Sequence, residues 1–391
     1  MRLTTYAYPW DLARLGVDRT LGEIAAYGFD AIDLAATYHP IDALSPRGDS
    51  VRSFSSARGA VHFPARAERY GRIRPSTSAP EVCAAWPRVA ATASGLGLDV
   101  NAWTITLFQP WILDSHPECA RVLPGGGASG SGVCPANDDV REYVATLCAD
   151  MAEQFSLHTI RLEAPITQAY DFDWLRPRVL VGVSPLAASL LALCRCPACS
   201  RRAVDAGLDH PRLQQLADDA IRAELQEGVA GNADRATTLA GDAELRALAA
   251  QQARAATELV RGVIEHVRAA MGPTAPRFAT SLSTPFGPLL DTTEDALLTE
   301  LAAEVDTVTV MPGPGRANDR VARLAGIATP APAIDMLLAP AHARTRPGEQ
   351  EPASFREAVE LDVSELGLYN YGLLRDRDVR MFTDAFRACF G

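Results

Sequence analysis

The sequence lacks any run of about 18 apolar residues, the length that a membrane-spanning helix requires. Residues 1–6 lack the apolar stretch of a signal peptide. Positive charge is not in excess either: the formal net charge is −11, which argues against nucleic-acid and anionic-membrane partners. The eight cysteines are too few for a disulfide scaffold. Together these absences predict a cytoplasmic protein whose clustered cysteines bind metal.

Nucleotide-binding loops are also missing. No Gly-x-Gly-x-x-Gly follows a predicted strand in a βαβ context, which argues against a dinucleotide-binding fold. The glycine-rich stretch 125–132 lacks the Gly-Lys-Ser/Thr of a phosphate-binding loop, so it predicts a flexible loop.

What the sequence does contain is a series of short apolar runs that alternate with amphipathic helical stretches. We expect strands over residues 2–8, 29–36, 98–108, 159–164, 277–283, 305–311, 333–338 and 366–371. Eight such units predict an α/β protein with a (β/α)8 TIM barrel in one domain, 1–391, with a doubly wound open sheet as the alternative. Residues 165–234, after the fourth strand, are predicted to form a long insertion that a bound zinc ion holds in place.

The insertion carries the motif Cys194-Arg195-Cys196-Pro197-Ala198-Cys199, and a fourth thiol, Cys134, lies upstream. Four thiolates at such spacing suit a tetrahedral zinc site, which has no open position and is structural. The alternative is unrelated thiols near a loop, one of them paired with Cys134. Cys119 is a spare candidate ligand.

Active sites of (β/α)8 barrels form at the carboxyl ends of the strands, so we looked for acidic residues there. Glu163 closes the predicted fourth strand, and Asp335 is the only acid in the seventh. Asp291, after the fifth strand, is a second choice. The structural alternatives are an ion pair of Glu163 with Arg161 or Arg176, and an Asp335 that orients a neighbour or faces a helix.

Several motifs share a resemblance to known proteins. They are Val100-Asn101-Ala102-Trp103-Thr104, the Cys-Pro-Ala-Asn at 134–137, Leu162-Glu163 and Tyr369-Asn370-Tyr371-Gly372. Over residues 3–374 the chain resembles an uncharacterised bacterial group of glycosidase-like TIM barrels. The cysteine cluster is similar to the zinc cluster of β-galactosidases in glycoside hydrolase family 42.

The resemblance implies a glycoside hydrolase-like enzyme whose partner is a small-molecule carbohydrate or glycoside. In family 42 the general acid/base ends strand four, which corresponds to Glu163, and the second carboxylate ends strand seven, which points to Asp335. The chain departs from the family pattern at Leu162, where those enzymes carry a sugar-binding asparagine. The resemblance therefore implies the chemistry but no particular sugar.

Polar and aromatic residues near predicted strand ends are candidates for substrate binding, because sugar rings present apolar C–H faces that stack on aromatic rings. The candidates are His39, His62, Trp10, Trp103, Trp111, Asn370 and Tyr371. We expect Tyr369 and Tyr371 to share one face of the eighth strand. The alternative for all of them is a role in the barrel core or in anchoring loops.

Two other functions remain open. Residues 24–34 resemble the opening of xylose-isomerase-type barrels, and a metal-dependent sugar isomerase or epimerase would use Glu163, His39 and Asp335 as ligands, with Asp33 at a position where such barrels often carry an acid. A carbohydrate-binding pseudoenzyme would keep the barrel, the zinc and the aromatic residues but have no second carboxylate opposite Glu163. The oligomeric state is left open.

Overall fold

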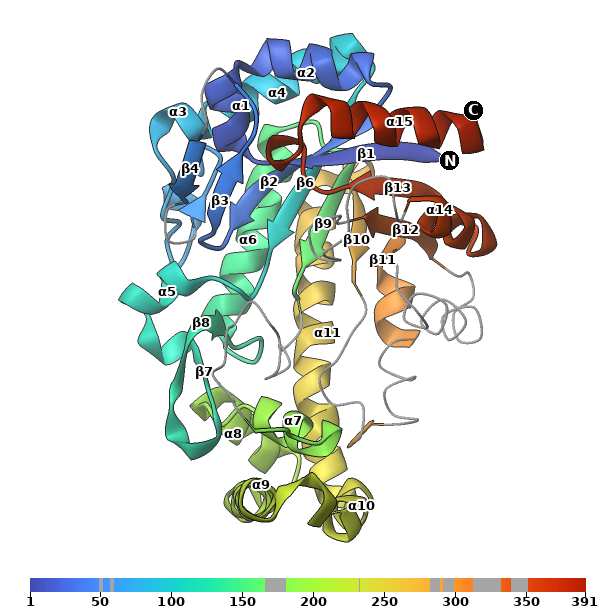
Figure 1. Ribbon diagram of the computed structural model, residues 1–391. Helices are drawn as coiled ribbons and strands as arrows, with labels where there is room; N and C mark the ends of the chain where they lie inside the picture. Colours follow the sequence, from blue (N-terminus) through green and yellow to red (C-terminus); the bar gives the residue numbers. More distant parts are fainter. Residues whose placement is uncertain are drawn as a thin grey trace.

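A closed parallel barrel forms the centre of the computed structural model, which describes residues 1–48, 52–56, 60–165, 181–231, 233–281, 289–290, 299–311, 332–338 and 351–391 (Figure 1). The barrel strands are β1 (Arg2–Ala7), β2 (Ala31–Tyr38), β6 (Asp99–Ile105), β9 (Thr159–Glu163), β10 (Arg277–Thr280), β11 (Thr307–Val310), β12 (Ala333–Leu338) and β13 (Glu365–Leu368). Each pairs in parallel with the next, and β1 closes the barrel by pairing with both β2 and β13. The expected (β/α)8 barrel is confirmed.

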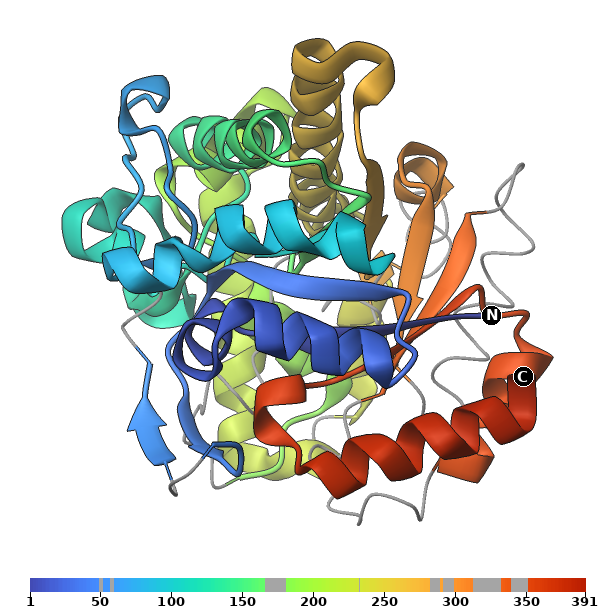
Figure 2. The same ribbon diagram turned by 90° about the horizontal axis from the view of Figure 1, so that it is seen from above.

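Helices cover the outside of the barrel, and Figure 2 shows α4, α15 and the first helices of the chain lying outside the strands. Their bounds are α1 (Pro9–Leu15), α2 (Val17–Ala26), α3 (Pro80–Cys83), α4 (Ala85–Ala93), α6 (Asp138–Gln154), α11 (Ala243–Met271), α14 (Glu351–Glu360) and α15 (Asp376–Phe390). None of the described helices is both long and apolar enough to cross a membrane.

Burial on both faces explains why the strands read as apolar runs. All eight residues of β2 are buried, because one face meets the barrel interior and the other meets the helices. The main apolar cluster lies between strands and helices and includes Ile32, Ile160, Val308 and Leu366. Some of the helices begin at a side-chain cap: at α6, the side chain of Asn137 accepts from the backbone N–H of Val140.

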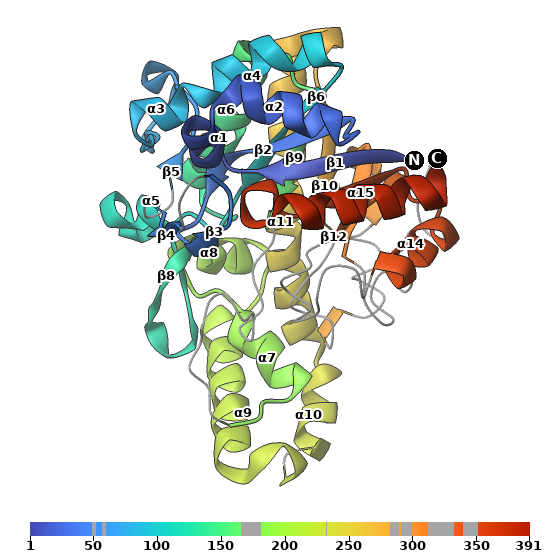
Figure 3. The same ribbon diagram turned by 45° about the horizontal axis from the view of Figure 1, so that its top comes forward.

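The segment after β9 forms a helical insertion: α7 (Pro185–Ala192), α8 (Pro197–Asp205), α9 (His210–Gly231) and α10 (Ala233–Ala240). These helices have their own apolar cluster, which includes Leu190, Leu213 and Leu248. Helix α11 belongs to both clusters, since its first half packs on the insertion and its second half, with Val263 and Ile264, on the barrel (Figure 3). The insertion thus shares a helix with the barrel, and the single-domain organisation stays a prediction.

Short elements flank the barrel end where the strands finish. These are the hairpin of β3 (Asp42–Ser45) and β4 (Arg52–Ser55), β5 (Ala60–Val61), α5 (Pro110–Ser115), the hairpin of β7 (Ala120–Val122) and β8 (Ala128–Val133), and the 3-10 helix η7 (Tyr371–Leu373). Strand β5 pairs antiparallel with the end of β2. The eighth strand is shorter than expected, because the chain turns into η7 at Asn370, whose side chain accepts from the backbone N–H of Gly372.

Candidate functional site

Glu163 is the last residue of β9, so the strand delivers its carboxyl group to the carboxyl end of the barrel. The side chain is half-buried, and its carboxylate accepts a hydrogen bond from the indole N–H of Trp103 on the neighbouring strand β6. Glu163 therefore stands at the edge where (β/α)8 barrels carry their reactive groups.

Buried aromatic rings lie beside this carboxyl group. We call them the aromatic cluster: Tyr6, Tyr8, Trp10, Tyr38, Trp103 and Phe108. Trp103 is at their centre, and its ring centroid lies 4.5 Å from that of Tyr38 and 5.0 Å from that of Tyr6. The half-buried ring of Tyr369, which follows β13, packs edge-on against Trp103 at 5.7 Å. The rings form an apolar wall beside the Glu163 carboxyl group, and the half-buried ring of Tyr369 is the part of this wall that is more open to solvent.

Three tyrosine hydroxyls meet within this wall, from the carboxyl-terminal ends of three strands or the residues just after them. The hydroxyl of Tyr369 lies 2.6 Å from that of Tyr8 and 3.0 Å from that of Tyr38. Burial raises the pKa of all three phenols, and the charge of nearby Glu163 raises it further. The phenols are therefore neutral hydrogen-bonding groups beside the carboxyl group.

The apolar surroundings of Glu163 change its acidity. Burial raises the pKa of Glu163 to about 7, while the hydrogen bond from Trp103 lowers it. Burial disfavours the charged form of a carboxyl group, and a donor that binds the carboxylate favours it. With a pKa near 7 the group exchanges a proton readily at neutral pH, as a general acid or base must.

Removing the Trp103 donor gives a direct test of this electrostatic balance. We expect Trp103→Phe to raise the pKa of Glu163 above about 7, because the N–H favours only the ionised carboxylate. The pKa is measured by NMR titration of carbon-labelled glutamate side chains, with Glu163→Gln to assign the signal. The matched control is Trp86→Phe. This variant also removes a buried indole N–H, but one that donates to the backbone carbonyl of Ala35 and not to Glu163. Equal pKa values in both variants would contradict the expectation.

A charged group spans the barrel interior next to this site. We call it the Arg161 network: the guanidinium of Arg161 donates to the carboxylates of Asp33, Asp335 and Glu365, all buried. Desolvation raises the pKa of Glu365 to about 8, against the lowering effect of the Arg161 charge. Four strands are thereby joined through one side chain.

Asp335, the expected second carboxylate, belongs to this network. It is the third residue of β12, and its carboxylate accepts from Arg161 at 2.7 Å and from the hydroxyl of Ser364 at 2.9 Å. Glu163, in contrast, is hydrogen-bonded to Trp103 and not to Arg161 in the described contacts. The role of Asp335 as second carboxylate stays a prediction, and Asp291 lies outside the described residues.

The two candidate histidines differ in position. His39 follows β2, stacks on Tyr38 at 4.3 Å and meets Phe108 edge-on, so it is in contact with the aromatic cluster. His62 is buried behind Trp10, and its Nδ1 lies 2.7 Å from the hydroxyl of Ser78. Burial lowers the pKa of both rings, that of His62 to about 3, so both are neutral at pH 7.

Among the remaining candidates, Trp10 stacks on Tyr8 at 4.3 Å within the aromatic cluster. Tyr371 does not share a face with Tyr369 as expected, because β13 ends before it. Its hydroxyl donates to Glu23 and its ring lies under the Arg47 guanidinium. Asn370 is buried and caps η7.

Trp111 belongs to α5, where its indole N–H donates to Gln109. It packs edge-on against Tyr143 of α6 and is part of the main apolar cluster rather than the aromatic cluster. Sequence reasoning missed Tyr6, Tyr8 and Tyr38 as wall residues. Their position at the ends of the first two strands could have indicated them. Side chains alternate along a strand, so Tyr6 and Tyr8 point to the same face.

The four cysteines of the expected metal site do come together. Cys134 follows β8, Cys194 precedes α8, Cys196 caps α8 and Cys199 lies in its first turn, and their buried sulfurs are all within 4.8 Å of one another. A tetrahedron of Zn–S bonds of about 2.3 Å has sulfur–sulfur edges of about 3.8 Å. The Cys134 sulfur lies 3.5 Å from that of Cys199 and 3.8 Å from that of Cys194. The four side chains could therefore hold a metal ion.

Hydrogen bonds tie this cluster to the rest of the protein. The side-chain amide of Gln252 on α11 donates to the carbonyl of Cys194 and accepts from its N–H, both at 2.8 Å. The guanidinium of Arg195 makes two bonds of 2.6 Å to the carboxylate of Asp218 on α9. The cluster thus joins the β7–β8 hairpin, the insertion and α11.

Comparison with known proteins gives the fold but no family. No family model matches the sequence, and a search of curated proteins finds no match. Among solved structures, the PgaB (BpsB) glycoside hydrolase domain from Bordetella bronchiseptica superposes with a TM-score of 0.58 at 15% identity, covering 100% of this chain and 98% of that chain.

Two larger structures are also similar at the level of fold. They are alpha-L-fucosidase isoenzyme 2 from Paenibacillus thiaminolyticus (TM-score 0.56, 12% identity) and a beta-galactosidase from the psychrophilic Marinomonas ef1 (TM-score 0.56, 9% identity). Each covers 99% of this chain, which spans only 49% and 59% of their respective lengths. The chain thus has the TIM-barrel fold of these glycoside hydrolases, and its resemblance to family 42 stays a prediction.

Proposed function

We propose that this protein is a glycoside hydrolase in which Glu163 is the general acid/base. The observation that carries the proposal is a carboxyl group at the carboxyl end of β9, beside a wall of aromatic rings, with a pKa near 7. A glycosidase acid must be protonated when it meets the glycosidic oxygen and must give up that proton as the bond breaks. A pKa close to neutral pH satisfies both demands.

The second carboxylate is assigned to Asp335, as part of the same proposal. Its carboxylate lies 2.7 Å from the guanidinium of Arg161, and a nucleophile or oxocarbenium-stabilising group in a glycosidase is a carboxylate of this kind. To act, its carboxylate would need to turn from Arg161 and Ser364 toward the substrate. Separations of about 5–5.5 Å between the two carboxyl groups belong to retaining enzymes and about 6.5–9.5 Å to inverting ones.

A carbohydrate-binding pseudoenzyme is the second candidate, because Asp335 is engaged by two hydrogen bonds inside the barrel. The isomerase hypothesis has less support. It requires carboxylates and His39 to converge on one ion, whereas Asp33 and Asp335 both bind Arg161. Within the described residues, the cysteines form the sole group of three or more ligands.

The deciding experiment is a screen of the purified protein against 4-nitrophenyl glycosides of neutral sugars in both anomeric forms, with calorimetry on the corresponding free sugars. Release of nitrophenol that follows enzyme concentration supports the hydrolase. Binding of a free sugar without any turnover would favour the pseudoenzyme, and aldose–ketose conversion of a free sugar would favour the isomerase.

For the cysteine cluster we propose a structural zinc ion held by Cys134, Cys194, Cys196 and Cys199. Four thiolates leave no open coordination position, so the ion would support the fold and take no part in chemistry. The cytoplasmic location, the absence of nucleic-acid and membrane partners, and the single domain with its insertion stay predictions.

Removing the proposed zinc should loosen the insertion but leave the barrel folded, because the two have separate apolar clusters. We expect about one zinc ion per chain in the wild type and almost none in Cys194→Ser/Cys196→Ser, measured by mass spectrometry of the metal. Hydrogen exchange should accelerate in α7, α8 and the β7–β8 hairpin. The control is Cys389→Ser, an exposed cysteine outside the cluster. Unchanged zinc content in the double variant would refute the assignment.

A further inference from the structure

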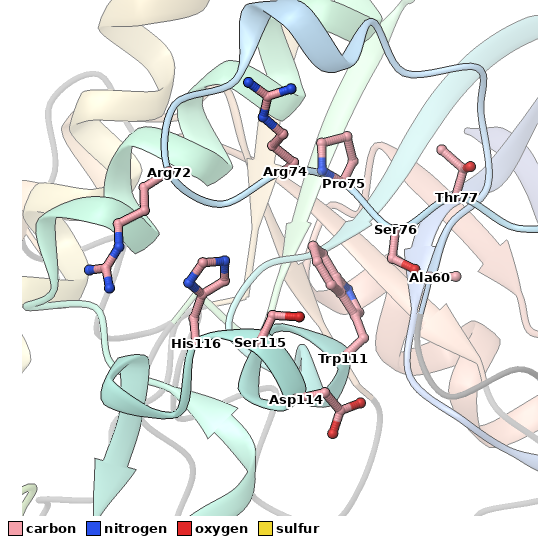
Figure 4. Close-up of a pocket in the computed structure, with 10 residues that line it drawn as sticks. All are labelled: Ala60, Arg72, Arg74, Pro75, Ser76, Thr77, Trp111, Asp114, Ser115 and His116. Carbon is pink, nitrogen blue, oxygen red and sulfur yellow. The ribbon is translucent and has the colours of Figure 1, made fainter.

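A cavity lies beside the barrel mouth, between α5 and the loop that follows β5 (Figure 4). We call it the α5 groove. Its volume is about 590 Å³, within the range of ligand-binding clefts. Its lining includes the side chains of Arg72, Arg74, Ser76, Trp111, Asp114 and His116.

The groove is adjacent to the aromatic cluster. Ala60, which lines it, pairs with Tyr38 in the short antiparallel ladder of β5 and β2. Phe108 of the aromatic cluster lies in the loop between β6 and α5, and Trp111 lies three residues later in the first turn of α5. A chain of sugar units bound at Glu163 could therefore continue over the end of β5 into the groove.

The chemistry of the groove suits hydroxyl groups. Arg74, Ser76 and His116 offer donors, and Asp114 offers an acceptor. Figure 4 shows Trp111 rising from α5 toward the loop that carries Pro75 and Ser76. Donors, an acceptor and an aromatic edge within one cleft are the groups that bind a sugar.

The charges in and around the groove do not favour an anion. The guanidinium of Arg72 is 2.6 Å from Glu118 and 2.8 Å from Asp139, so two carboxylates neutralise it. Arg74 makes no ion pair with a described residue, but Asp114 lines the same cleft. A phosphate or sulfate would meet these carboxylates, whereas an uncharged sugar both donates and accepts.

We propose that the α5 groove is a carbohydrate-binding subsite that holds the distal units of a neutral oligosaccharide. The substrate would then be a chain of several sugar units rather than a single glycoside. This rests on the proposed function only for the choice of carbohydrate as ligand. Binding in the groove does not require hydrolysis.

The test is calorimetric binding in a Glu163→Gln background, with maltohexaose, cellohexaose, xylohexaose, galactohexaose and chitohexaose as probes. We expect one or more of these hexasaccharides to bind, and Arg74→Ala/Asp114→Ala to weaken that binding about tenfold or more, as loss of charge-assisted hydrogen bonds does. Binding of the corresponding monosaccharide should be unchanged. Both residues are exposed, so the fold should survive.

The matched control is Arg377→Ala/Asp384→Ala, which removes one exposed arginine and one exposed aspartate from α15. Equal hexasaccharide affinity in the two double variants, or no hexasaccharide binding at all, overturns the proposal. Inorganic phosphate binding that only the groove variant loses would instead identify an anion site. Hexasaccharide binding without turnover by the wild-type enzyme would refute the hydrolase but support the groove, so the two failures are distinguishable.

Discussion

Glu163→Gln is expected to lower kcat/KM for a glycoside substrate by about 10²- to 10⁴-fold, the usual contribution of a general acid or base. Glutamine keeps the shape of the side chain and still accepts the Trp103 hydrogen bond, but it has no proton to transfer. The loss should be smaller for substrates with nitrophenol leaving groups, which depart with less protonation. Steady-state kinetics on aryl and alkyl glycosides of one sugar measures both effects.

The pH dependence gives this prediction its internal control. The raised pKa keeps Glu163 protonated below about pH 7, so acid-assisted cleavage should fall as pH rises through that value. The falling limb should be absent in Glu163→Gln. Glu81→Gln, at an exposed position on α3, is the matched variant and should behave as wild type. Full activity of Glu163→Gln would exclude Glu163 as the acid/base.

Much of the barrel could be predicted because its strands are buried on both faces. The sequence predicts the seventh strand over the same residues that β12 occupies, 333–338. The third was predicted too long, to residue 108 instead of Ile105. Leu107 and Phe108 are apolar because they pack on the core and the aromatic cluster from a loop, which composition cannot distinguish from a strand.

The candidate site could be predicted only where the residues that form it lie close together in the sequence. Glu163 closes an apolar strand, and the three-thiol motif lies within six residues, so both were visible locally. The partners of Arg161 are 128, 174 and 204 residues away in sequence. A charged residue inside an otherwise apolar strand indicates a buried ion pair. The sequence does not show which acids pair with Arg161, because these residues meet only when the barrel closes.

Arg161→Met is expected to destabilise the protein by about 3–5 kcal/mol, as removal of one partner of a buried ion pair does. The substitution leaves the carboxylates of Asp33, Asp335 and Glu365 buried without their common cation. Thr4 and Ser364 still donate to the first two, but neither supplies charge. Urea unfolding at pH 7 measures the free energy of unfolding. Arg277→Met, at an exposed arginine that begins β10, is the matched control.

Arg161→Met removes both a charge and packing contacts. Two further measurements, the pH dependence of the destabilisation and a variant that also neutralises the carboxylates, distinguish these two causes. Without the cation, the pKa of Glu365 should rise above the value of about 8 that it has beside Arg161, so the stability that the folded variant gains from protonation of this group is lost as pH rises. The destabilisation should therefore be smaller at pH 5 than at pH 8. Arg161→Met combined with Asp33→Asn, Asp335→Asn and Glu365→Gln should recover part of the loss at pH 8. A destabilisation that neither pH nor neutralisation changes would mean that Arg161 acts through packing alone.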